Sequence, residues 1–100
     1  ANLIIDIPTA YEEKATKVER VLTKTIEEIK KMKYVYDNCS YLGISKLGAS
    51  EIIYSISIEC SQEHQWEVKR NILRLIKDTY DKENIKIPYT QIEVHNGQNI

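Results

Sequence analysis

Two histidines and two cysteines are the residues through which this chain could bind a metal ion or carry out nucleophilic chemistry. His64 and His95 are isolated in the sequence, and Cys39 and Cys60 are far apart, whereas zinc sites use closely spaced ligands. Cysteines without such spacing are typical of a protein from a reducing compartment, and we expect both to be packing residues. The sequence therefore predicts no metal site and no cofactor.

Catalytic and phosphate-binding motifs are also missing from the sequence. Serine, histidine and aspartate residues occur without a motif that would bring a nucleophile beside a base. The three glycines are too scattered to form a phosphate-binding loop. We expect His64 to be exposed near a helix start, and we expect Trp66 and Tyr80 to belong to the core rather than to a pocket. The chain is therefore not expected to be an enzyme.

The balance of charges argues against a nucleic-acid partner. Lys and Arg number 14 and Asp and Glu number 15, so the net charge of -1 provides no field to hold a polyanion. The stretch Glu51–Ile58 contains one aromatic residue and no basic residue, unlike the RNA-stacking strand of RNA-recognition domains.

The longest uncharged stretches are far shorter than the roughly 20 apolar residues of a membrane-spanning helix. We expect one soluble domain, and the missing initiator Met suggests a fragment of a larger protein.

The first quarter of the chain predicts a strand followed by a long helix. Asn2–Ile7 is rich in branched aliphatic residues, and we expect this strand to stop at Pro8, which cannot donate a ladder hydrogen bond. Thr9 and Glu12 have the spacing of a capping box, which predicts a helix start there and an end among the lysines near Lys33. The apolar face of this helix is predicted to contain Tyr11, Ala15, Val18, Leu22, Ile26, Ile29 and Met32.

The middle of the chain predicts a hairpin. Tyr41–Leu47 and Glu51–Cys60 have strand character and are joined by the short connection Gly48–Ser50. In the second strand, apolar and polar residues alternate, so that one face is apolar and the other mostly polar. The predicted apolar face consists of Ile52, Tyr54, Ile56, Ile58 and Cys60. We therefore expect helices on only one face of the sheet.

The last part of the chain predicts a second helix and further strands. Ser61 is a candidate N-cap, and Asn84 is a candidate left-handed C-cap. Between them lies an apolar stripe formed by Trp66, Val68, Ile72, Leu73, Leu75, Ile76 and Tyr80. Ile85–Ile87 can then begin a strand that is interrupted at Pro88, and alternation resumes over residues 91–94.

The order of these elements predicts an α+β fold, a ferredoxin-like βαββαβ two-layer sandwich with an extra C-terminal strand. Residues 1–88 would form the domain, and residues 89–100 would form the C-terminal strand and tail. Many unrelated functions use this topology, so the fold alone predicts no function.

Three stretches are distinctive: Leu47–Ser50 at the hairpin, Ile72–Lys77 followed by Tyr80–Asp81 in the second helix, and Asn84–Val94, which is the most specific. They resemble the C-terminal α/β domain of the small-conductance mechanosensitive (MscS) channel family. Two positions depart from the family pattern. Asn84 stands where glycine is usual, and Thr90 replaces the second proline of a Pro-aromatic-Pro-Gln run.

The resemblance implies a heptameric channel whose cytoplasmic parts form a hollow chamber below a tension-opened pore. This chain would be part of the chamber wall at the cytoplasmic face of the inner membrane, attached through transmembrane segments that it does not contain. Its roles would be assembly, solute filtering and gating during osmotic downshock. In the family the final strand leaves the domain and joins copies from other subunits. The residues that correspond here are Pro88, Tyr89, Gln91, Ile92 and Val94.

Other interpretations remain open. The final strand could pair with its own sheet instead of with other subunits. The domain could be a regulatory module that binds a small effector at a subunit interface, which thermal-shift screening of metabolites would detect. It could also be an oligomerisation adaptor. Several apolar segments of about 20 residues upstream of Ala1 would favour the channel.

Overall fold

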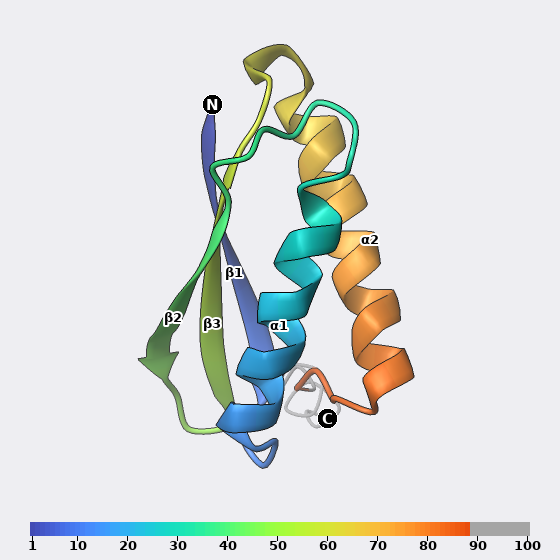
Figure 1. Cartoon of the computed structure of the whole chain (residues 1–100). Coiled ribbons are helices and arrows are strands. Elements are labelled where there is room, and N and C mark those ends of the chain that lie inside the picture. The colour runs from blue at the N-terminus through green and yellow to red at the C-terminus, as the bar shows by residue number, and fades with distance from the viewer. Residues whose placement is uncertain (89–100) are drawn as a thin grey trace, which may run out of the picture.

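A three-stranded antiparallel sheet carries two helices on one of its faces (Figure 1). The strands are β1 (Asn2–Ala10), β2 (Ser40–Leu47) and β3 (Glu51–Glu59), and the helices are α1 (Ala15–Ile29) and α2 (Gln65–Glu83), which follows a short 3-10 turn over Gln62–His64. This computed structural model describes residues 1–88. The predicted α+β class, the hairpin and the placement of both helices on one face are confirmed.

The order of the strands is β1-β3-β2, so β3 is central and β1 and β2 are the edges. The strand predicted at Ile85–Ile87 is not formed, because only Lys86 of this segment makes a backbone hydrogen bond to β1. The described residues therefore contain three of the four strands of a βαββαβ sandwich. The extra strand predicted over residues 91–94 lies outside the described residues.

β1 runs through Pro8, where the sequence had predicted its end. Ala1 exchanges backbone hydrogen bonds with Cys60, whereas the amide of Ala10 points the other way and donates to the carbonyl of Lys86 at 2.9 Å. Because hydrogen-bonding direction alternates along an antiparallel edge strand, even-numbered residues of β1 direct their backbone groups away from β3. Pro8 is one of them, so its missing N–H removes no bond from the ladder.

The predicted capping box does not form, and α1 begins at Ala15 with Lys14 as its N-cap. Thr9 is instead buried at the end of β1, where its hydroxyl lies 2.8 Å from the hydroxyl of Tyr80. The prediction was wrong because pairing with β3 extends to Ala10 and holds Thr9 in the strand. Tyr11, predicted on the buried face of the helix, consequently lies before α1 and is exposed.

The core lies between the sheet and the helices. α2 contributes one residue per turn, Val68, Ile72, Ile76 and Tyr80, and α1 contributes Val18, Val21, Leu22, Ile26 and Ile29. They pack on the predicted apolar face of β3, all of which is buried. Trp66, predicted in the core, is 63% exposed, since it lies two residues before Val68 and thus about 200° around the helix.

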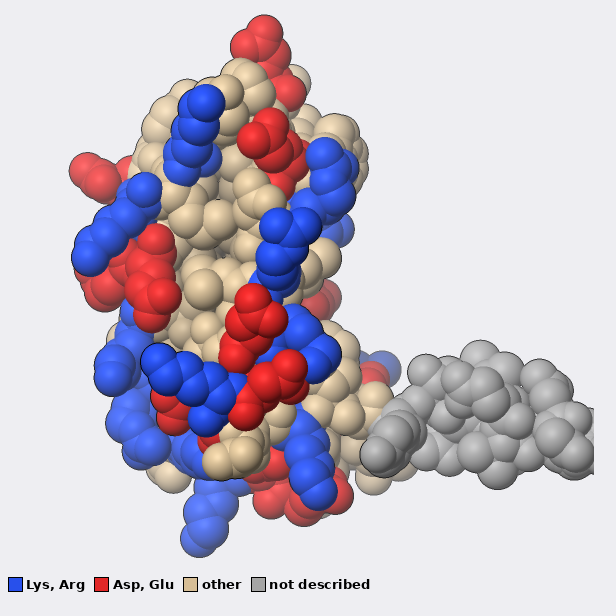
Figure 2. Space-filling model, turned by 90° about the vertical axis from the view of Figure 1, so that its right-hand side faces the viewer, with Lys and Arg blue, Asp and Glu red and all other residues tan. Residues whose placement is uncertain are grey.

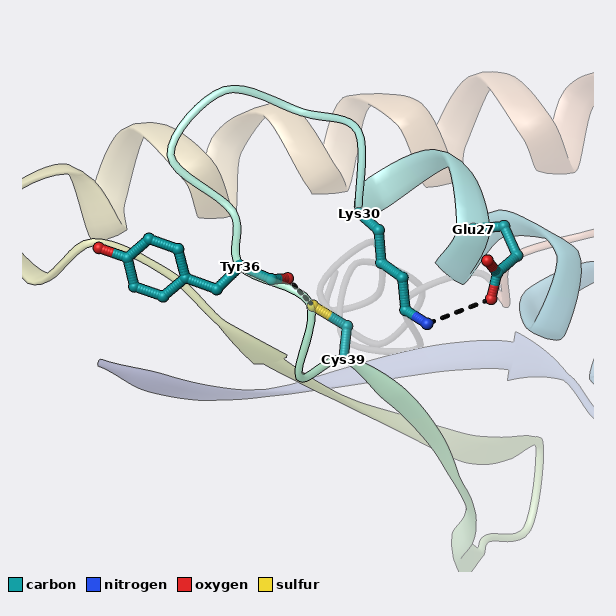
Figure 3. Close-up of polar contacts among 4 residues, drawn as sticks. All are labelled: Glu27, Lys30, Tyr36 and Cys39. Atoms are coloured by element: carbon teal, nitrogen blue, oxygen red, sulfur yellow. Dashed lines mark hydrogen bonds and ion pairs between the residues drawn. The ribbon is translucent and has the colours of Figure 1, made fainter.

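The loop between α1 and β2 contains an internal hydrogen bond and packs an aromatic ring on the turn before α2. The thiol of Cys39 donates to the carbonyl of Tyr36 at 3.2 Å within the loop, and an exposed ion pair between Lys30 and Glu27 lies at the end of α1 (Figure 3). Tyr34 of the loop stacks on His64 with 3.5 Å between ring centroids. His64 is therefore half-buried rather than exposed as predicted, while the predicted burial of Cys39 and Cys60 is confirmed.

One buried polar atom of the described core has no hydrogen-bond partner, the hydroxyl of Tyr54. We expect Tyr54→Phe to raise the free energy of unfolding by about 1 kcal/mol, because it removes a desolvated hydroxyl without removing a bond. Tyr80→Phe is the matched control and should lower it by about 1 kcal/mol, because Thr9 then loses its 2.8 Å partner. Urea denaturation measures both. Equal destabilisation by the two variants would contradict this account.

Burial raises the pKa of Tyr80 to about 12, and burial also raises the pKa values of Tyr41 and Tyr54. Because the folded-state pKa is higher than the value of about 10 in an unfolded chain, folding favours the neutral phenol. This contribution is fully present below pH 10 and is lost as the pH rises toward 12. We expect the free energy of unfolding to fall over this range, and to fall less steeply in Tyr80→Phe. If the free energy of unfolding fell equally steeply with pH in the wild type and in Tyr80→Phe, the assigned contribution of Tyr80 would be wrong.

Candidate assembly site

The chain leaves the core at the end of α2 through a left-handed turn. Asn84 has φ 59° and ψ 41°, which confirms its predicted role as the C-cap. The amide of the following residue, Ile85, donates to the carbonyl of Tyr80 at 2.8 Å, and the side chain of Ile85 is buried. The turn therefore fixes the direction in which the chain crosses from α2 toward the edge of the sheet.

Lys86 brings the chain to the open edge of β1, where Glu13 holds it. The carbonyl of Lys86 accepts from the amide of Ala10, and the amide of Lys86 donates to the carboxylate of Glu13 at 3.0 Å. The backbone amide of Glu13 in turn donates to the carbonyl of Ala10 at 3.1 Å. These three bonds connect the turn before α1, the end of β1 and the exit of the chain.

The predicted oligomerisation residues begin at this point. Pro88 is half-buried and, with Tyr11, Ser50 and Lys86, lines a surface pocket of about 420 Å³. Ile87, beside it, is 42% exposed. The other predicted residues, Tyr89, Gln91, Ile92 and Val94, lie outside the described residues. The structure thus gives the place where this segment starts, and its role in association stays a prediction.

On the face of the sheet opposite the helices, β3 is mostly polar as predicted for that strand, whereas the outer strands add exposed apolar residues. Ile4 is 59% exposed there, and Leu42 on β2 is also exposed. Between them, the hydroxyl of Ser55 donates to the carboxylate of Asp6 at 2.6 Å and lies 3.1 Å from the hydroxyl of Ser45. The alternation within Asn2–Ile7 could have indicated Ile4, because every second residue of a strand lies on the same face.

The helical side of the molecule offers a groove of about 330 Å³ between α1 and α2. Its walls carry basic side chains such as Arg20 and Lys24 and acidic ones such as Glu28 and Asp78. Figure 2 shows the two signs of charge interspersed over this side. Such a surface attracts neither a polyanion nor a polycation strongly.

Within residues 1–88, no three histidine, cysteine or acidic side chains gather closely enough to hold a metal ion. Neither of the helices described here is long and apolar enough to cross a bilayer.

Comparison with known proteins decides the family. The profile described as "Mechanosensitive ion channel MscS, C-terminal" matches residues 3–87, which include all the described helices and strands except the first residue of β1. The chain belongs to this family. A relative named small-conductance mechanosensitive channel, from Caldanaerobacter subterraneus subsp. tengcongensis, is 25% identical over 92 residues. The aligned region covers 91% of this chain and 33% of the relative, so the chain spans about a third of that channel.

Asn84 occupies the turn that starts the exit of this MscS C-terminal domain. We expect Asn84→Ala to lower the free energy of unfolding by about 1 kcal/mol, because a Cβ-bearing residue without a polar side chain is strained at positive φ. Asn84→Gly removes that strain and should match or exceed the wild type. Chemical denaturation of the three proteins tests the order. An alanine variant as stable as the glycine variant would contradict the C-cap role.

Proposed function

We propose that this chain is a cytoplasmic wall and assembly piece of a mechanosensitive channel that opens under membrane tension. Several copies would surround a chamber below the pore, as a heptamer if the family pattern holds, and limit which solutes approach it during osmotic downshock. The pore and the membrane anchor would belong to other parts of the parent protein. We propose no catalytic role for the domain.

One observation carries the proposal: the family match spans residues 3–87 and therefore all of the described sheet and helices except the first residue of β1. Two structural facts support it. The described surface grooves are lined by interspersed charges or by the exit of the chain, and neither receives an unpartnered buried polar group. The exit of the chain itself lies at an open edge of the sheet, and such edges are where further chains can pair.

The self-association is proposed to run through residues 88–94, with Ile92 and Val94 on one face of the final strand. In the full-length channel, Ile92→Asp should reduce the heptamer fraction at least about tenfold at low protein concentration, because it places a charge in an apolar interface. Native mass spectrometry of the detergent-solubilised channel measures this. Gln98→Asp, beyond the proposed strand, is the matched control and should leave assembly unchanged.

We expect the isolated 100-residue chain to be monomeric or weakly associated, because on this proposal the rest of the parent channel is what concentrates its interfaces. Sedimentation at micromolar concentration separates the two cases. A tight heptamer of the isolated chain, or a full-length channel in which Ile92→Asp and Gln98→Asp assemble alike, would argue against the proposed assembly segment.

A further inference from the structure

The open edge of β1 has a defined hydrogen-bonding register. Its outward-facing residues are the even-numbered ones, as the bond from the amide of Ala10 to the carbonyl of Lys86 establishes. Within residues 1–88, the outward amides of Ile4 and Asp6 receive no backbone partner. This edge is therefore a template on which the segment after Lys86 could continue as a fourth strand antiparallel to β1.

Two prolines would form the next hydrogen-bonded pair if the segment after Lys86 continued along β1. In an antiparallel ladder the hydrogen-bonded pair after Ala10 and Lys86 lies two residues further along each strand, which brings Pro8 opposite Pro88. Neither residue has an N–H group. Both hydrogen bonds of that pair would be missing, and two carbonyl groups would face each other without a donor.

Glu13 also prevents complete pairing between Ala10 and Lys86, the first pair of such a ladder. A complete Ala10–Lys86 pair needs a second bond, from the amide of Lys86 to the carbonyl of Ala10. In the structure, the carboxylate of Glu13 accepts from that amide and the backbone amide of Glu13 occupies that carbonyl. The pair of Ala10 and Lys86 therefore has one of its two ladder bonds. The donor and the acceptor of the second bond are both engaged by Glu13 instead.

We propose that Pro8, Pro88 and Glu13 act together to end the sheet at β1 and to exclude the segment after Pro88 from its own domain. The excluded segment then pairs with the same segment of other copies of the chain, a consequence that rests on the proposed function. The exclusion itself follows from the register and needs no partner. Pro8 and Glu13 are thus positioning residues for assembly, although neither belongs to the assembly segment.

The experiment measures amide hydrogen exchange in the isolated chain at a concentration where it is monomeric. In the wild type, the amides of Ile4 and Asp6 should exchange close to the rate of unprotected peptide groups, while those of Ile5 and Ile7, which face β3, are protected. In the double variant Pro8→Val/Pro88→Val, the fourth strand can form, and protection of Ile4 and Asp6 should rise at least about tenfold.

A third substitution shows whether the gain comes from the tail. In the continued register Ile92 would lie opposite Ile4. Ile92→Pro added to the double variant removes the bond that residue 92 would donate to the carbonyl of Ile4 and disfavours a strand there, so the Ile4 amide should return to fast exchange. The amides of Ile5 and Ile7 report in the same spectrum that each variant is folded. Slow exchange of Ile4 and Asp6 in the wild type, or no gain in a folded double variant, would overturn the exclusion.

The same variants in the full-length channel separate this inference from the proposed function. If the tail assembles the channel, Pro8→Val/Pro88→Val should lower the heptamer fraction, because the domain now retains its own tail. If exchange behaves as expected but neither this variant nor Ile92→Asp alters assembly, the exclusion stands and the proposed assembly segment is wrong.

Discussion

The central strand β3 is the element on which the rest of the domain depends. It pairs with β1 along one edge and with β2 along the other, and its inner face is buried along its whole length. Both edges of β3 are occupied by neighbouring strands. Its apolar inner face can therefore be covered only by elements that pack on that face of the sheet, and both helices do so. The one-residue-per-turn stripe of α2 and the broader stripe of α1 fit this single surface.

This arrangement also determines the character of the two outer strands. β2 is irregular, with register shifts on both sides of Gly43, which itself has φ 127°. Such irregularities twist an edge and hinder the addition of further strands. β1 pairs with β3 without any register shift, so its open edge is not protected by irregularity. The two prolines and Glu13 hinder the addition of a further strand there instead. The two edges are thus protected by different chemistry.

The features that the sequence predicted well are those set by periodicity. The alternation of β3 and the four-residue spacing in α2 each allow only one buried face, and Asn84 follows from the need for a left-handed cap. The hairpin and the α+β class were accessible for the same reason. Trp66 shows where periodicity fails. An apolar residue next to the buried stripe of a helix cannot be told from a member of the stripe by sequence alone, and only the packing of α2 on the sheet shows that Trp66 is exposed.

The errors concentrate where local signals compete with tertiary contacts. Thr9 and Glu12 have the spacing of a capping box, but the hydroxyl of Tyr80, 71 residues away, and the pairing with β3 keep Thr9 in the strand. The interpretation of Pro8 as the end of the strand was wrong. Proline is tolerated within an edge strand where its nitrogen points away from the ladder, and no local pattern shows which way the nitrogen points. Glu13 at the exit could not be found for the same reason, as its partner Lys86 is distant in sequence.

The two cysteines have a practical consequence for the chemistry that can be done on this domain. Both thiols are buried, and burial raises the pKa of Cys60, so the reactive thiolate is disfavoured in the folded protein. A cysteine introduced at an exposed site would therefore react with a maleimide probe or a bifunctional cross-linker well before the native thiols. The native sequence is ready for site-specific labelling without prior removal of its own cysteines.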